Sequence, residues 1–149
     1  MKGMKRLVLL TSVVCVALGA GAASAAQKAD VNLPLDQVKL VPIEGVPGVS
    51  QADLWGDSNK GAHGTLVKFA AGTKTALHTH SSADKIVVIS GTMVFGNAEG
   101  KEVKLGPGSY RLEPAGFPHT TSCAEGADCL FFSTQSAAFD VKWVEPAKK

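Results

Sequence analysis

The stretch GTKTALHTHSSADKIVVISG, residues 72–91, contains the features that decide the fold. His78 and His80 stand two positions apart, ahead of a run of β-branched residues that ends before Gly91. Side chains two positions apart on a strand point to the same face, so the two imidazole rings are expected to lie close together. This spacing predicts a two-point clamp for a metal ion. A satisfied pair of core or surface histidines is the competing interpretation.

A second stretch, GSYRLEPAGFPHTTSC at residues 108–123, brings a third histidine. His119 follows a loop that contains Pro114 and Pro118, and it opens a short strand that ends at Cys123. Imidazoles from neighbouring strands, together with a carboxylate such as Asp84, form a borderline-soft ligand set suited to Zn, Fe, Mn, Ni or Cu. The sequence therefore predicts one divalent metal ion and leaves its identity open.

Together the two stretches resemble, in order and in spacing, the two sequence motifs of the cupin superfamily. The first reads Gly72, five residues, His78-Thr79-His80, three residues, Asp84, six residues, Gly91. The second reads Gly108, five residues, Pro114, one residue, Gly116, two residues, His119, three residues, Cys123. The chain departs from the family pattern at two positions, with Asp84 in place of the usual Glu and Cys123 in place of the usual Asn.

This resemblance implies an all-β fold, the double-stranded β-helix or jelly-roll barrel of the cupins. It also implies that His78, His80 and His119 hold the metal inside the barrel. Asp84 takes the position of the family's carboxylate ligand, but its side chain is one methylene shorter than that of Glu. We expect Asp84 to reach the metal only through water, if it reaches it at all.

The pattern of short runs supports an all-β fold independently of the resemblance. Helical periodicity is nearly absent beyond residue 25, and β-rich runs alternate with turns rich in Gly, Pro and Asn. About ten short strands favour a sandwich or jelly-roll barrel over α/β layering. The expected strands are 38–41, 64–70, 76–80, 85–89, 92–95, 101–105, 109–113, 119–123, 129–134 and 139–144.

The N-terminus has the anatomy of a secretory signal peptide over residues 1–25. Three basic residues in the first six precede an apolar run from Leu7 to about Ala22, and Ala23-Ser24-Ala25 offers a cleavage site. The apolar run is short for a membrane span, which needs about 20 residues. We therefore expect cleavage near Ala25, no stable membrane anchor, and a periplasmic or secreted protein.

Beyond the signal, the sequence predicts a single domain. We expect an N-terminal arm at 26–61 that packs on the barrel, a cupin domain at 62–145 and a tail at 146–149. All 13 acidic residues lie beyond residue 25, and three of the 15 basic residues lie before it, which leaves a net charge of −1. No basic stripe remains to suggest a nucleic-acid partner.

Two cysteines, Cys123 and Cys129, bracket a five-residue loop that reads as a hairpin turn. Paired in register, they would face each other, and an exported protein meets oxidising conditions, so we expect a disulfide. The competing interpretation is functional: Cys123 shares strand parity with His119 and could face the cavity as a free thiol or soft ligand. Cys15 is expected to be lost with the signal.

Two classes of function remain open at this stage, because cupins carry many activities on one scaffold. One is a metal-dependent enzyme, a dioxygenase, isomerase or hydrolase acting on a small organic substrate. The other is a non-catalytic small-ligand-binding or sensing module of the cell envelope. No residue is assigned a catalytic role; Glu113, Tyr110 and His63 are further acid–base candidates, with His63 expected in a loop or at the rim. A homodimer stays open.

Overall fold

The structure, a computed structural model, describes residues 30–145. The predicted signal peptide at 1–25 and the tail at 146–149 lie outside these residues. The chain divides into two units, Met1–Asn32 and Leu33–Lys149, and all the strands described belong to the second. Within residues 30–145, no helix is long and apolar enough to cross a membrane.

Eleven strands and one 3₁₀ turn, η1 at Leu35–Gln37, make up the regular structure of the described residues. This confirms the predicted all-β class, and each expected strand overlaps a strand of the structure. The strands are β1 Val41–Pro42, β2 Val49–Gly56, β3 His63–Phe69, β4 His78–Thr79, β5 Asp84–Ser90, β6 Met93–Asn97, β7 Glu102–Leu105, β8 Tyr110–Glu113, β9 His119–Cys123, β10 Cys129–Gln135 and β11 Lys142–Trp143.

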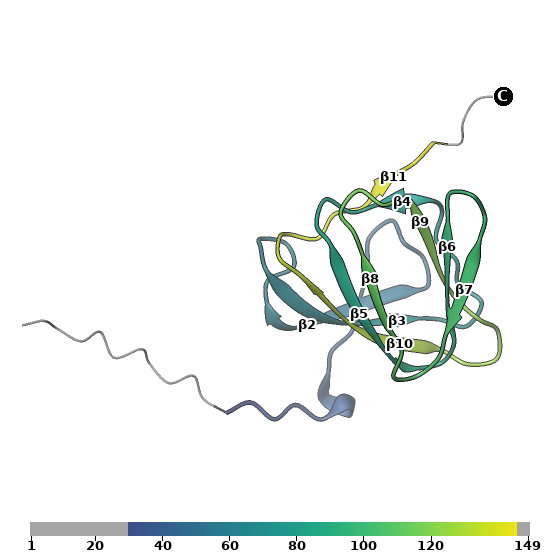
Figure 1. The fold of residues 1–149 in the computed structure, drawn as a ribbon. Coiled ribbons are helices and arrows are strands. Elements are labelled where there is room, and N and C mark those ends of the chain that lie inside the picture. The colour runs from purple at the N-terminus through teal and green to yellow at the C-terminus, as the bar shows by residue number, and fades with distance from the viewer. Residues whose placement is uncertain (1–29, 146–149) are drawn as a thin grey trace, which may run out of the picture. The chain divides into compact units, whose positions relative to one another are not determined.

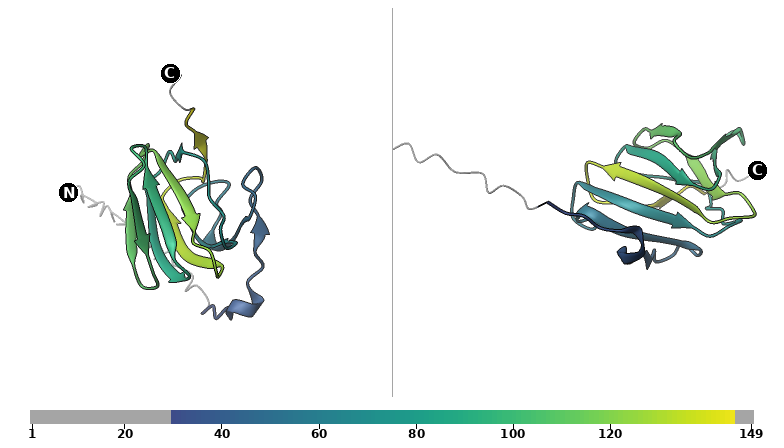
Figure 2. Two further views of the ribbon diagram at one scale, coloured as in Figure 1. Left: turned by 90° about the vertical axis from the view of Figure 1, so that its right-hand side faces the viewer. Right: turned by 90° about the horizontal axis from the view of Figure 1, so that it is seen from below.

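The strands form two antiparallel sheets that face each other (Figure 1). The six-stranded sheet has the order β1-β2-β3-β10-β5-β8, and the five-stranded sheet has the order β11-β4-β9-β6-β7. Strands distant in the sequence are therefore neighbours: β10 lies between β3 and β5, as the view from below shows (Figure 2, right). This non-sequential order is the jelly-roll arrangement that the resemblance implied.

The interior changes from apolar to polar along the strands, and this gradient positions the site. In β10 every second side chain is buried, from Cys129 to Gln135, as expected of a strand with one face on the core. Its inward residues begin as part of the hydrophobic core and end as polar groups. β3 and β9 show the same change. The inward series are Cys129, Phe131, Ser133, Gln135 in β10; Phe69, Val67, Thr65, His63 in β3; and Cys123, Thr121, His119 in β9.

Strand β2 lies within the segment 26–61, where the sequence predicted an arm and no strand beyond residue 41. It pairs with β3 from Val49 to Gly56, so part of this segment is a full member of the six-stranded sheet. Its pattern is hard to recognise because only Val49 is buried and Pro47 stands just before it. A bulge between Asp53 and Trp55 also breaks the alternation. The domain boundary near residue 61 stays a prediction.

Cys123 and Cys129 lie at disulfide distance, with their Sγ atoms 2.06 Å apart and their Cα atoms 5.7 Å apart. The hairpin on which this pairing was predicted is wrong, however. β9 belongs to the five-stranded sheet and β10 to the six-stranded sheet, so the loop between them crosses from one sheet to the other. The cysteine pair therefore joins the two sheets at the apolar end of the interior, where both side chains are buried in the core.

Gly91 shows why the turn after β5 requires glycine. Its φ of +75° lies in the left-handed region, and a Cβ at this position would stand 2.7 Å from Sγ of Cys129. Both the backbone and the neighbouring cysteine pair exclude a larger residue here.

Candidate metal centre

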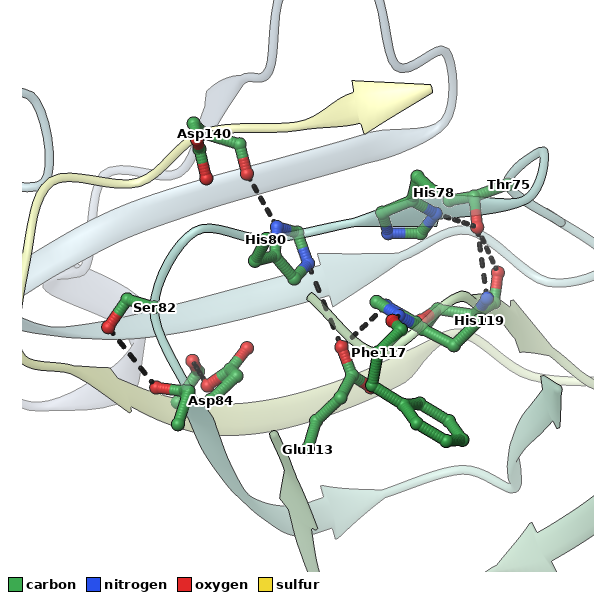
Figure 3. A network of polar contacts seen from close by, with 12 residues as sticks. Thr75, His78, His80, Ser82, Asp84, Glu113, Phe117, His119 and Asp140 are labelled. Carbon is green, nitrogen blue, oxygen red and sulfur yellow. Dashed lines mark hydrogen bonds and ion pairs between the residues drawn. The ribbon is translucent and has the colours of Figure 1, made fainter. Parts of the chain in front are cut away.

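His78, His80 and His119 converge at the polar end of the interior (Figure 3). His78 lies in β4 and pairs in register with His119 in β9, and His80 follows one residue after β4 ends. All three side chains are buried. Each offers one ring nitrogen, and these atoms all lie within 4.8 Å of one another. The structure thus brings together the three residues that the two motifs nominated.

Backbone carbonyls fix the orientation of all three rings. The Nδ1 atom of His78 lies 2.8 Å from the carbonyl oxygen of Ala76, and that of His119 lies 2.9 Å from the carbonyl oxygen of Phe117. His80 Nδ1 lies 2.5 Å from the carbonyl oxygen of Asp140. A neutral ring whose Nδ1 donates a proton carries its lone pair on Nε2. Three Nε2 lone pairs therefore face a common point, as in metal sites whose histidines are oriented by outer partners.

Glu113 is the carboxylate that meets this point, and the sequence did not identify it as a ligand. Its Oε1 atom lies 2.6 Å from Nε2 of His119 and 3.9 Å from Nε2 of His80. Arg111 contacts the other oxygen, Oε2, at 3.0 Å through both Nε and Nη2. Alternation along β8 places Arg111 and Glu113 on the same face, and in the structure this face is the inward one. Only the pairing of β8 with β5 decides this.

The contact between Glu113 and His119 reveals a place for a cation. Nε2 of His119 is fully buried and makes no hydrogen bond of normal geometry, although Oε1 of Glu113 is close. Because Nδ1 of this ring donates to Phe117, Nε2 faces the carboxylate oxygen as a second acceptor. Two acceptors at this distance repel unless a positive charge, a proton or a metal ion, is shared between them. The residues present therefore fit a bound metal ion.

Asp84 lies away from this contact, in the opposite sheet from the two His-bearing strands β4 and β9. It pairs in register with Glu113, and its Oδ1 accepts a hydrogen bond from Ser133 Oγ. Figure 3 shows its carboxyl group apart from the three rings. Burial raises the pKa of Asp84, with the charge of Glu113 adding to the effect. A short carboxyl group held by Ser133 accords with the expectation that Asp84 is at most an indirect partner.

Burial also shapes the ionisation of the groups at the centre. It lowers the pKa of His78 to about 4, so this ring is neutral at pH 7 and its Nε2 lone pair is free to bind a cation. For Glu113, burial opposes ionisation, but the adjacent His119 ring and the charge of Arg111 outweigh it and hold the pKa below its usual range. The centre thus combines neutral imidazole with a charged carboxylate.

Residues 139–143, a segment from the C-terminal part of the chain, pack over the histidine rings. Asp140 anchors it, since one carboxylate oxygen accepts from the backbone N–H of Ser81 at 2.7 Å and the other accepts from the Ser81 hydroxyl at 2.5 Å. The rings of Phe139 and Trp143 stand 5.4 Å from His80 and 5.5 Å from His78, respectively, between centroids. This segment therefore holds His80 through a carbonyl and shields two rings from water.

His63 is not at the rim as expected. It begins β3 and is buried, and its side chain lines the same cavity of about 60 Å³ as the three histidines. Its Nδ1 lies 2.8 Å from the carbonyl oxygen of Gly61. The only sequence signal for this position was its parity with Thr65 and Val67, which becomes informative once the inward face of β3 is known.

The two sheets form a jelly-roll barrel with the cupin fold, and the histidine cluster is buried inside it. A protein family described as "Domain of unknown function (DUF4437)" matches residues 30–149, and the chain belongs to this family. A search of curated proteins by sequence finds no match.

Solved structures share the fold. The polyketide cyclase RemF from Streptomyces resistomycificus superposes with a TM-score of 0.69 at 21% identity, over 80% of this chain and 89% of that one. A sugar phosphate isomerase of the cupin superfamily from Silicibacter pomeroyi gives 0.61 at 22% identity, over 78% and 83%. A predicted oxalate decarboxylase from Thermotoga maritima gives 0.60 at 20% identity, over 72% and 99%. At these identities the likeness concerns the fold.

Proposed function

We propose that this cupin binds one divalent metal ion through His78, His80 and His119, with Glu113 as the carboxylate of the site, and takes a small organic substrate in the adjoining cavity. The single observation that carries the proposal is the orientation of the rings. Each Nδ1 lies against a backbone carbonyl, and the three ligand atoms meet within 4.8 Å. Glu113 then adds a negative charge to a point already surrounded by acceptors.

A purely structural histidine cluster explains this arrangement less well. Without a metal ion the cluster needs a second proton, on Nε2 of His119, to stand between this ring and the Glu113 oxygen, because the three rings have already used their Nδ1 protons on carbonyls. Imidazole and carboxylate ligands suit Zn, Fe, Mn, Ni or Cu. Such an ion, when bound, would supply Lewis-acid or redox chemistry according to its identity.

The chain's own residues prepare the site for a substrate. Arg111 holds Glu113 by one oxygen and leaves the other toward the histidines, where it can hold or accept a proton. Phe139, Val141 and Trp143 add apolar side chains to the lining of the cavity. With a volume of about 60 Å³, the cavity is far smaller than the roughly 300–1,000 Å³ of pockets for drug-sized ligands. The substrate is accordingly a small molecule, and the structural neighbours named as a cyclase and a sugar phosphate isomerase support a small organic substrate.

A titration with Co(II), whose visible absorption reports its ligands, tests the metal site. We expect saturation at one equivalent per chain in the wild type and loss of the band in the His80→Ala/His119→Ala double variant. His63→Ala is the matched control, since His63 is a buried histidine of the same cavity outside the cluster. A double variant that binds Co(II) with the wild-type spectrum would contradict the proposal.

We also propose that the protein is exported, to the periplasm or beyond. The predicted signal peptide and the cysteine pair at disulfide distance support this, because disulfides persist in oxidising compartments. Intact mass spectrometry of protein from the periplasmic fraction and the medium should give a chain that begins at Ala26. A full-length mass confined to the cytoplasm would contradict export.

A further inference from the structure

A row of four polar side chains crosses the inner face of the six-stranded sheet opposite the histidines. His63 in β3 pairs in register with Gln135 in β10. Asp84 in β5 pairs with Glu113 in β8, and the pairing of Thr134 with Lys85 brings Gln135 and Asp84 to the same level. Paired residues on antiparallel strands point to the same face, so the row is continuous from His63 to Glu113. All four residues are buried and line the cavity.

Two members of this row have partners within the protein. Glu113 contacts Arg111 and His119, and Asp84 accepts a hydrogen bond from Ser133. These groups are accounted for by the metal site and its surroundings.

Gln135 is different, because its Oε1 atom is buried without any hydrogen-bond partner. The residue is only 4% exposed, and an acceptor buried in this way is unfavourable unless something donates to it. Its amide group lies close to Asp84 and favours the ionised form of that carboxyl group. Since the amide nitrogen is the group's donor, Oε1 is the acceptor of this cavity-lining residue that lacks a donor.

His63 adds a second acceptor beside the first. Its Nδ1 is engaged with the carbonyl oxygen of Gly61, so the neutral ring carries its lone pair on Nε2. The register pairing places this ring next to the Gln135 side chain. Two neighbouring residues that line the cavity therefore each carry an acceptor, at the end of the row away from Glu113.

We propose that Gln135 and His63 form a subsite that binds a hydroxyl group of a small, neutral, hydroxylated ligand. The proposal rests on the proposed function in that the other end of the ligand lies at the metal centre. Acceptors in the subsite select a donor group, and the carboxylates of Asp84 and Glu113 in the same wall disfavour an anion. The volume of about 60 Å³ restricts the ligand to a few carbon and oxygen atoms.

Hydroxyacetone and butanone are matched probes, since they differ only by a hydroxyl group in place of a methyl group. Binding is followed by amide chemical shifts in Zn(II)-loaded and in metal-free protein, with metal content measured on each sample. We expect the wild type to bind hydroxyacetone about tenfold more tightly than butanone, as one hydrogen bond to a buried acceptor allows. Gln135→Met should reduce the ratio of the two affinities to about one, since Met keeps the side-chain length but removes the acceptor.

Thr134→Val is the matched control, because Thr134 neighbours Gln135 on the same strand and points to the opposite face. It should keep the tenfold preference. If Gln135→Met does not fold, as judged by circular dichroism, His63→Phe tests the second acceptor and should reduce the preference in the same way.

A preference that depends on Gln135 in metal-free protein supports the subsite even if the metal proposal fails, so the two failures are distinguishable. A folded Gln135→Met variant with the wild-type preference overturns the subsite. Equal binding of the two probes by the wild type, or no detectable binding of hydroxyacetone, also overturns it and shows that the two acceptors are satisfied by water.

Discussion

Glu113 and Asp84 are paired across β5 and β8, yet only Glu113 touches a histidine ring. The difference lies in their partners: Arg111 holds Glu113 so that one oxygen faces His119, whereas Ser133 holds Asp84 by its Oδ1. In the proposed metal site the carboxylate therefore comes from the strand before His119, and Asp84, at the position that the cupin motif assigns to a carboxylate, would act only indirectly.

This arrangement predicts that Glu113→Gln weakens metal binding more than Asp84→Asn does. Gln keeps the size of Glu but removes the negative charge beside His119, and we expect a loss of about tenfold or more in metal affinity. Asp84→Asn should change the affinity less, because Ser133 already occupies its carboxyl group. Competition with a chromogenic chelator measures both. A larger loss for Asp84→Asn would make Asp84 the direct ligand.

At the residue scale, the motif spacing predicted the three histidines as metal ligands but did not predict Glu113. His78 and His80 are two positions apart, and their shared face follows from strand geometry alone. The inward face of β8 depends instead on its pairing with β5 and on the level at which Asp84 meets Glu113. The alternation of side chains along one strand cannot predict the inward face or the level of pairing. Both depend on contacts between segments distant in the chain.

At the scale of the elements, the loop 124–128 joins the two sheets. Cys123 ends β9 and Cys129 begins β10, so the cysteine pair ties the five-stranded sheet to the six-stranded one at the apolar end of the interior. Both side chains belong to the hydrophobic core, together with Met93 and Phe95. Cys123 is thus at the opposite end of β9 from His119, which argues against a role as a metal ligand.

We predict that the denatured, unreduced mature protein has no free thiol and that reduction exposes two. The closed ring is small, and on the chain-entropy model it stabilises the fold by about 2 kcal/mol. Reduction should accordingly lower the melting temperature only modestly. A thiol count with and without a reductant measures this. Two reactive thiols before reduction would contradict the disulfide and would favour the free-thiol interpretation.

The elements also show where sequence patterns fail. The expected strands that overlap the structure alternate clearly or contain β-branched runs, as β5 does from Ile86 to Ile89. β2 escapes prediction because its inward face is mostly polar and a bulge shifts its register. The hairpin expected at 124–128 fails for a different reason: a short turn-like loop indicates a change of direction but not whether the next strand joins the same sheet.

At the scale of the whole molecule, the polarity of the interior separates stability from function. β3, β9 and β10 each place apolar side chains at the end that carries the cysteine pair and polar ones at the other. The apolar end forms the hydrophobic core, and the polar end holds the histidine cluster, Glu113 and the subsite of Gln135 and His63. A ligand site can thus tolerate buried polar groups because the core lies elsewhere.

Metal analysis of the protein purified from its native compartment tests the central claim most directly. We predict one divalent metal ion per chain in the wild type, and its identity will distinguish redox from Lewis-acid chemistry. Protein carrying His80→Ala and His119→Ala, purified in the same way, should contain almost none, while His63→Ala should keep the wild-type content. Wild-type metal content in the double variant, or a wild-type protein free of divalent metal, would contradict the account.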